Sequence, residues 1–293
     1  MMPQAVDVLC IGSVLWDIIG RSSSHMRAGS DVPGRITRIP GGVAMNIAMA
    51  LKAYGMQPAL LSAVGRDPEG EELVAACARL GMVTTHLYRS EDLPTDTYMA
   101  VEGGNGLIAA IADAHSLEQA GAKILRPLES GALAGWAGII ALDGNLTEAL
   151  LSDIAVSETF ARTDLRIAPA SPGKAERLTP FLHAGRATLY VNLEEANLLL
   201  RESHGSAAEA ARALVGRGVH RVLVTNGGDA AACGSQSGTF TAQPREVMVT
   251  RVTGAGDTFM AAHIAAEAKG AAPDAALERA LEAAAIYVSG ETY

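Results

Sequence analysis

Short apolar runs alternate with segments of helical periodicity along most of the chain. The first run, Val6 to Gly12, is apolar apart from Asp7 and closes in Gly-Ser, which is typical of a strand buried on both faces. Similar runs follow at 59–64, 138–142, 188–191 and 222–225. Helical spacing of apolar residues is found at 46–54, 69–80, 147–160, 206–217, 256–269 and 275–287. This alternation predicts an α/β fold of three layers, with helices on both faces of a mainly parallel central sheet.

Two segments break this alternation. Residues 18–39 are polar and punctuated by Gly and Pro, and residues 97–112 read TYMAVEGGNGLIAAIA, two strand-like arms around a Gly-Asn-Gly turn. We expect insertions at about 18–39 and 95–112 to form a small β-sheet lid; two surface loops are the alternative. Since no repeat or long linker is visible in the 293 residues, we expect residues 1–293 to form a single domain that carries this lid.

Composition narrows the classes of function. The chain is 49% hydrophobic and carries a formal net charge of −9, which favours a globular protein and argues against nucleic-acid or anionic-membrane partners. Cys10, Cys77 and Cys233 are widely spaced, without the pattern of a zinc site or a disulfide framework. The longest apolar stretch, 131–142, is too short to span a bilayer. We therefore expect a soluble, cytoplasmic protein.

The best candidate for chemistry is Thr-Gly-Ala-Gly-Asp at 253–257, which opens a predicted helix. The N–H groups of Gly254, Ala255 and Gly256 can hold an anion there, where the helix dipole adds about half a positive charge. Asp257 would repel a phosphate unless it accepts a proton, as a general base for phosphoryl transfer does. The alternative is an ordinary glycine cap followed by an acidic residue. Neither a GxxxxGK[ST] nor a GxGxxG motif occurs elsewhere in the chain.

The TGAGD segment resembles the second signature of the ribokinase-like (PfkB) carbohydrate and nucleoside kinases. Residues 40–48, with a di-glycine before Asn46, resemble the first signature of that family, and residues 62–70 resemble the strand and turn that follow it. Further matches in the family's order are Gly12 with Asp17, Asn192 with Glu195, and Thr225 with Gly227. The similarity runs from residue 6 to about 288. It implies a ribokinase-like fold and a kinase that uses ATP and Mg²⁺.

The resemblance also implies a role for each motif residue. It makes Asp257 the catalytic base, with an anion hole built by Gly254, Ala255 and Gly256. It assigns substrate binding to Asp17, Gly41, Gly42, Asn46, Thr97 and Asn145. It assigns cofactor binding to Asn192, Thr225, Gly227, Gly254, Gly256 and Ala284, with Ala283 and Tyr287 also near adenine. It implies that Glu195 and Asn192 hold Mg²⁺ through water. Taken as plain sequence, Asp17 could equally be a turn residue and Glu195 an acidic residue in the first turn of a helix.

Within the family, several stretches are most similar to the pseudouridine kinases: 34–36, 94–101, 143–146, 169–174 and 252–257. The implied reaction transfers phosphate from ATP to the 5′-hydroxyl of pseudouridine, with Thr95, Thr97 and Asn145 near the uracil. Ribose, another nucleoside or a keto-sugar acid is the alternative acceptor, and a catalytically idle ligand-binding regulator is the alternative class.

One departure from the family pattern concerns a cofactor. Arg251 stands where an acidic residue often supports a monovalent-cation site, so the resemblance to a K⁺-binding kinase is incomplete at this position. The strand-like arms of the lid predict a homodimer by pairing of sheets, although an exposed edge could also be capped within one chain.

Overall fold

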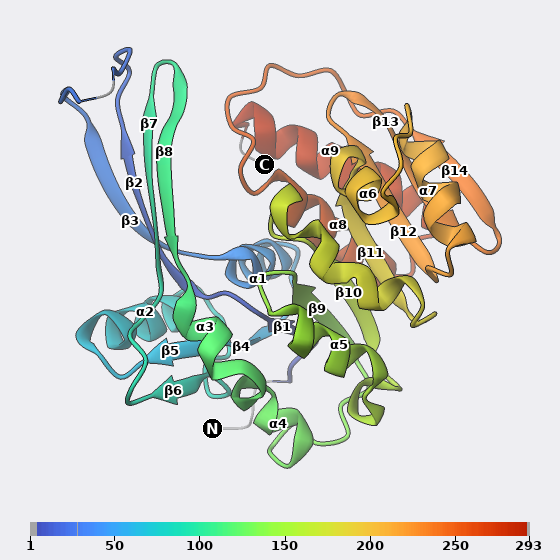
Figure 1. The fold of residues 1–293 in the computed structure, drawn as a ribbon, viewed down its shortest axis with the longest axis horizontal. Coiled ribbons are helices and arrows are strands. Elements are labelled where there is room, and N and C mark those ends of the chain that lie inside the picture. The colour runs from blue at the N-terminus through green and yellow to red at the C-terminus, as the bar shows by residue number, and fades with distance from the viewer. Residues whose placement is uncertain (1–4, 28, 292–293) are drawn as a thin grey trace.

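An eight-stranded sheet forms the centre of the computed structural model, which describes residues 5–27 and 29–291 (Figure 1). Across the sheet the strands are β14 (Gly238–Ala242), β13 (Asp229–Ser235), β12 (Arg221–Asn226), β11 (Ala187–Asn192), β10 (Asp164–Ala168), β9 (Ile139–Asp143), β1 (Val8–Ile11) and β4 (Pro58–Leu61). Strands β12 to β4 are parallel, whereas β13 and β14 are antiparallel to their neighbours. The prediction of a mainly parallel sheet is confirmed.

Helices cover both faces of this sheet. One face carries α1 (Val43–Ala53), α2 (Pro68–Arg79), α8 (Ala255–Ala268) and α9 (Pro273–Ser289). The other carries α3 (His115–Ala120), α4 (Arg126–Glu129), α5 (Glu148–Val156), α6 (Leu193–Leu200), α7 (Ala207–Gly216) and 3₁₀ helices at Gly121–Leu125, Glu158–Phe160 and Pro172–Leu182. Strand β1 shows why: Val8 and Cys10 pack into one core, Leu9 and Ile11 into the other, and all are fully buried. No described helix is long and apolar enough to cross a membrane.

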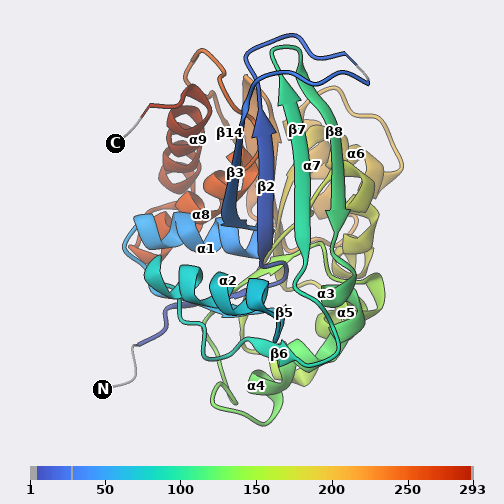
Figure 2. The same ribbon diagram turned by 90° about the vertical axis from the view of Figure 1, so that its left-hand side faces the viewer.

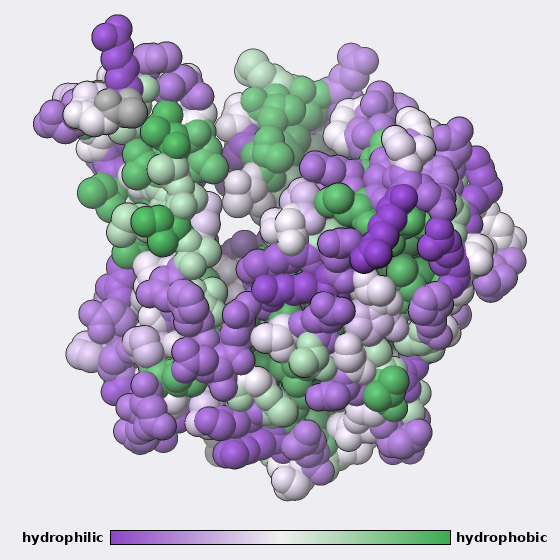
Figure 3. Space-filling model, in the orientation of Figure 1, coloured by the Kyte–Doolittle hydropathy of each residue, from purple (hydrophilic) through white to green (hydrophobic). Residues whose placement is uncertain are grey.

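The two insertions do form strands of one separate sheet (Figure 2). This four-stranded sheet, called the lid sheet below, has the order β3 (Arg35–Gly41), β2 (Leu15–Arg21), β7 (Thr97–Gly103) and β8 (Gly106–Asp113). Strands β2 and β7 are parallel neighbours, so they join the two insertions. A further pair, β5 (Ala63–Gly65) and β6 (Tyr88–Ser90), lies beside α2. Figure 3 shows an opening between the lid sheet and the rest of the molecule.

A buried ionic cluster fastens α8 to the main sheet. Glu267 of α8 lies between Arg166 of β10 and Arg221 of β12, at 2.5 and 2.6 Å from their guanidinium nitrogens. The Arg166 side chain is only 7% exposed. On the same helix, the fully buried His263 is hydrogen-bonded through Nδ1 to the Tyr190 hydroxyl at 2.8 Å. These contacts hold the helix that begins with the TGAGD segment.

The Glu267→Gln variant is expected to lose about 3 kcal/mol of unfolding free energy, because the mostly buried Arg221 loses its carboxylate partner and Arg166 keeps only Asp164. Urea denaturation followed by circular dichroism measures this loss. Glu278→Gln, an exposed position on α9, is the matched control and should stay within about 0.5 kcal/mol of the parent. Equal midpoints for the two variants would contradict the role given to the cluster.

Candidate active site

The sequence motifs from the two ends of the chain meet at the carboxyl ends of the parallel strands. Asn46 lies in the first turn of α1, and Asp257 lies in the first turn of α8. The Asn46 Nδ2 group donates a hydrogen bond of 3.1 Å to Asp257 Oδ2, across 211 residues of sequence. The two signatures therefore belong to one site.

The start of α8 offers unpaired N–H groups beside Asp257. Gly254 is the N-cap with φ of 89°, and a Cβ there would lie 2.5 Å from the Tyr287 hydroxyl, so only glycine fits. The Ala255 N–H donates to the Val252 carbonyl at 3.0 Å and is not available to a ligand. Within the described residues, the N–H groups of Gly254, Gly256 and Asp257 donate to no protein acceptor. Of the three N–H groups predicted to hold an anion, that of Ala255 is therefore occupied, whereas the N–H group of Asp257 is free in the described structure.

Burial and charge tune the carboxyl groups of this site. The pKa of Asp257 is raised to about 7, chiefly by burial; the Asn46 hydrogen bond opposes this rise, and the nearby Asp143 and Asp17 carboxylates add to it. Burial also raises the pKa of Asp17 to about 6. A carboxyl group with a pKa near 7 can accept a proton at neutral pH and release it again, which suits a general base.

The glycines of the first signature let two polar groups approach the backbone closely. A Cβ on Gly41 would lie 2.0 Å from Asp17 Oδ2, so the Asp17 carboxyl group lies against the backbone of β3. Gly42 has φ of 92°, and a Cβ there would lie 2.5 Å from the Ser13 carbonyl oxygen. Both glycines are therefore required by neighbours within the protein, in addition to any approach of a sugar.

A network around Asp143 was not foreseen from the sequence. The Asp143 carboxylate is fully buried at the end of β9 and accepts hydrogen bonds from Ser13 N at 2.8 Å, Ser13 Oγ at 2.5 Å and Asn145 N at 2.7 Å. Ser13 Oγ in turn accepts one from Val43 N, at the start of α1. The network joins the turn after β1, the start of α1 and the loop after β9. The signal in the sequence was an Asp at the end of an apolar strand, followed by Gly-Asn.

The lid residues differ from their predicted roles. The strand register pairs Thr97 with Trp16, and Tyr98 with Asp17. Thr97 therefore lies on the face of the lid sheet opposite to Asp17, and Tyr98 replaces it beside the site. Burial and the Asp17 carboxylate raise the pKa of the Tyr98 phenol. The Thr95 hydroxyl donates to Asp67 Oδ1 at 2.6 Å, so its proton is not available to a ligand.

On the other half of the site, Asn192 and Glu195 form the capping box of α6. Asn192 Oδ1 accepts from Glu195 N at 2.9 Å, and Glu195 Oε2 accepts from Asn192 N at 2.8 Å. Burial raises the pKa of Glu195 to about 7. The other Glu195 oxygen and the Asn192 amide nitrogen remain free of hydrogen bonds in the described structure. Among the described residues, no three His, Cys, Asp or Glu side chains gather closely enough to hold a metal ion.

The remaining predicted nucleotide residues lie around the ends of β12 and α9. Thr225 is the register neighbour of Asn192, and Gly227, with φ of 56°, forms the turn after β12. Ala284 is partly buried against the core of α8 and α9, and Ala283 is fully buried in it, which excludes Ala283 as a ligand contact. Tyr287 is held by the loop before α8: its hydroxyl donates to the Thr253 carbonyl at 2.8 Å.

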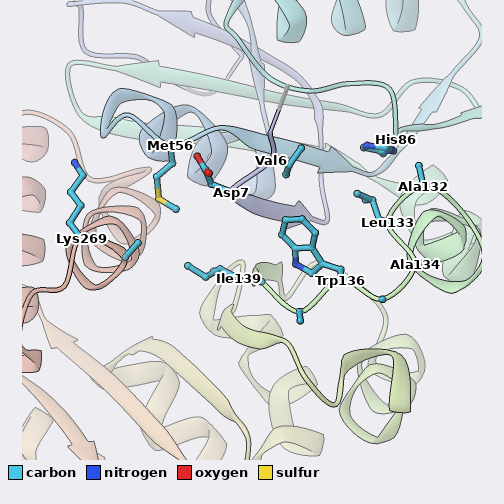
Figure 4. A pocket seen from close by; sticks show the side chains of 14 residues that line it. Val6, Asp7, Met56, His86, Ala132, Leu133, Ala134, Trp136, Ile139 and Lys269 are labelled. Atoms are coloured by element: carbon cyan, nitrogen blue, oxygen red, sulfur yellow. The ribbon is translucent and has the colours of Figure 1, made fainter. Parts of the chain in front are cut away.

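A cavity of about 1000 Å³ lies away from this site, at the amino ends of β1 and β9 (Figure 4). Trp136, Leu133 and Ile139 line it together with Asp7 and His86. None of the predicted site residues lines it. The candidate site is instead an open surface between the lid sheet and the carboxyl edge of the main sheet.

The sequence and the fold of this chain are similar to those of known proteins. Residues 5–292 match the model of the pfkB family of carbohydrate kinases. The chain is 29% identical over 259 residues to pseudouridine kinase from Escherichia coli, covering 87% of this chain and 81% of that protein. Its fold matches a carbohydrate kinase from Agrobacterium tumefaciens with a TM-score of 0.81 at 26% identity, over 96% of this chain and 90% of the other. It also matches Arabidopsis thaliana ribokinase, solved with ribose and ATP, with a TM-score of 0.74 at 19% identity, over 97% and 93%. The chain belongs to the pfkB family of carbohydrate kinases, phosphotransferases that act on a hydroxyl group.

Proposed function

We propose that this protein transfers phosphate from ATP to the 5′-hydroxyl of a nucleoside, with pseudouridine as the substrate. The observation that carries the kinase reaction is the Asp257 carboxyl group, bound by Asn46 and lying beside the unpaired N–H groups at the start of α8. The similarity to pseudouridine kinase over most of both chains supports the choice of substrate. Kinases of this family use ATP and a divalent metal.

We propose a part in the reaction for each group. Asp257 takes the proton from the 5′-hydroxyl while that oxygen attacks the γ-phosphorus of ATP. A new phosphorus–oxygen bond forms, the bond to the bridging oxygen of the β-phosphate breaks, and its electron pair leaves with ADP. The N–H groups of Gly254, Gly256 and Asp257 stabilise the charge on the transferring group. A bound Mg²⁺ would neutralise phosphate charge near Asn192 and Glu195.

The acceptor would lie under the lid sheet. We propose that the Asp17 carboxylate accepts hydrogen bonds from the ribose hydroxyls, with Asn46 and the backbone of Gly41 and Gly42 on the other side. Tyr98, next to Asp17 on the same face, would lie over the nucleoside.

Arg251 bears on the choice of cofactors. Its guanidinium group stacks on the Tyr287 ring at 3.8 Å and donates to the Tyr287 carbonyl at 2.8 Å. Arg251 stands where an acidic residue often supports a monovalent-cation site. Because a positive side chain occupies this position, we propose that the cofactors are ATP and Mg²⁺, without K⁺. We place the reaction in the cytoplasm, a reducing compartment that suits the buried, free cysteines Cys10, Cys77 and Cys233.

The substrate proposal is tested by measuring Mg-ATP consumption with pseudouridine, uridine, adenosine, ribose and 2-keto-3-deoxygluconate. We expect the highest kcat/KM with pseudouridine, and a product phosphorylated at the 5′-oxygen by ³¹P NMR. A higher kcat/KM with ribose or the keto-sugar acid would contradict the proposed substrate but still support the kinase reaction. Turnover of none of these acceptors would favour a ligand-binding regulator.

The pH dependence tests the base. Because the pKa of Asp257 is about 7 and the base must be deprotonated, kcat/KM should fall as the pH drops through 7 and level off above it. Asp257→Asn should lower kcat by a factor of about 10² to 10⁴ and keep nucleotide binding. The matched control is Asp274→Asn at the far end of α9, which should leave the profile unchanged. Near-normal turnover by Asp257→Asn would rule out this mechanism.

We also propose that the lid sheet pairs with a second copy of the chain. The strand register places Ile36, Met99 and Ile111 on the face opposite to Asp17, where they are 77%, 47% and 69% exposed. A self-complementary apolar face of this kind favours a symmetric dimer.

Light scattering after size-exclusion chromatography is expected to show a dimer for the parent and a monomer for Ile111→Arg, because the charge would be buried in the interface. Val156→Arg serves as the control, since Val156 is 79% exposed on α5, outside the lid. A monomeric parent, or a dimer that survives Ile111→Arg unchanged, would contradict the proposed interface.

A further inference from the structure

Lys174 lies between the two halves of the site. The residues proposed for the nucleotide follow β11 and β12, and those proposed for the acceptor follow β1 and β9 or belong to the lid. Strand β10 lies between β11 and β9 in the sheet, and Lys174 follows it, in the 3₁₀ helix Pro172–Leu182. The topology therefore places this lysine where the phosphoryl group would pass from donor to acceptor.

The contacts of Lys174 leave most of its hydrogen-bonding capacity unused. Its Nζ donates to Asn145 Oδ1 at 2.5 Å. The Asn145 amide nitrogen is itself directed to Ser13 Oγ at 3.2 Å and Asp143 Oδ2 at 3.3 Å. The Asn145 amide is thus fully engaged within the protein, whereas the lysine ammonium, which carries three N–H donors, uses one. In the described structure Lys174 forms no ion pair.

Nearby cations are engaged elsewhere. Arg177 donates to the carbonyl oxygens of Asn145 and Leu146 at 2.9 and 3.1 Å and pairs with Glu118 at 3.0 Å. Arg251 is stacked on Tyr287, as described above. Lys174 is therefore a cation with free N–H donors among the described residues that follow the carboxyl ends of the parallel strands. It follows β10, which lies near the middle of the strand order.

The charges of the site require such a group. No described cation lies within ion-pair distance of Asp17, Asp143, Asp257 or Glu195. The incoming γ-phosphate adds further negative charge between them. Phosphoryl transfer is accelerated by cations placed on the oxygens of the transferring group, and a lysine ammonium is well suited to phosphate.

We propose that Lys174 is a catalytic residue whose Nζ binds an oxygen of the transferring γ-phosphoryl group. The proposal rests on the proposed kinase reaction and adds a contact to it. While Asp257 takes the proton and the bond to the β-phosphate breaks, Lys174 stays protonated and follows the phosphoryl group from ATP to the acceptor oxygen. Asn145, Ser13 and Asp143 act as positioning residues that fix the direction of the ammonium group.

Two measurements on Lys174→Met test this role. The first is turnover: kcat should fall by a factor of about 10² to 10³, while KM for the acceptor changes by less than about threefold. Lys174→Arg keeps the charge, and its kcat should be about tenfold higher than that of Lys174→Met. Lys123→Met, the same replacement at an exposed lysine outside the site, is the matched control and should behave as the parent.

The second measurement is nucleotide binding by isothermal titration calorimetry, which needs no acceptor. Lys174→Met should bind the non-hydrolysable ATP analogue AMP-PNP at least fivefold more weakly than the parent and bind ADP equally well, because ADP lacks the γ-phosphate. An equal loss for both nucleotides, an unchanged kcat, or a change in the acceptor KM alone would overturn the proposal. If the parent protein binds no AMP-PNP, the proposed kinase function itself fails. That outcome differs from failure of the Lys174 proposal alone, in which the parent does bind AMP-PNP.

Discussion

The site depends on the meeting of two helix N-termini at one edge of a parallel sheet. The hydrogen bond between Asn46 and Asp257 joins these two helices. Helix α1 brings Asn46 from the first third of the chain, and α8 brings Asp257 from the last fifth. The helices pack side by side over the same face of the sheet, so their first turns point to the same place. The cluster of Glu267, Arg166 and Arg221 holds α8 against the strands and so fixes the position of its first turn.

Carboxyl groups at this edge of the sheet repel one another when they are ionised. Hydrogen-bond donors and raised pKa values both reduce that repulsion. Asp143 is satisfied entirely by neutral donors, from Ser13 and Asn145, so its buried charge becomes part of the scaffold. Burial raises the pKa of all three carboxyl groups, and Asp17 and Asp257 have fewer hydrogen-bond donors than Asp143 to oppose that rise. The same desolvation that costs stability gives Asp257 the proton affinity a base needs. The unpaired N–H groups of α8 and the ammonium of Lys174 supply positive potential locally, in a protein whose net charge is −9.

The lid sheet has two faces with different chemistry, set by the alternation of residues along its strands. Asp17 and Tyr98 share the face toward the site, while Met99 and Ile111 share the other. A single residue of register exchanges these faces, which is why Thr97, next to Tyr98 in the sequence, lies on the wrong side to meet an acceptor.

The sequence by itself determined the alternation of buried strands and helices, the two lid insertions, and the order of the glycine, asparagine and aspartate motifs, because these depend on local periodicity and on residue types required at particular turns. It did not predict β10, since Asp164 and Arg166 make that strand look polar. Besides Asp164, Arg166 pairs with Glu267, which lies about a hundred residues away and is brought near only by packing. The tertiary structure likewise decided that Ala255 N–H is occupied, that Thr95 binds Asp67, and that Lys174 follows the strand that lies between β9 and β11. Each of these contacts depends on which groups from distant segments meet and on how deeply those groups are buried. The spacing of residues along one segment encodes neither property.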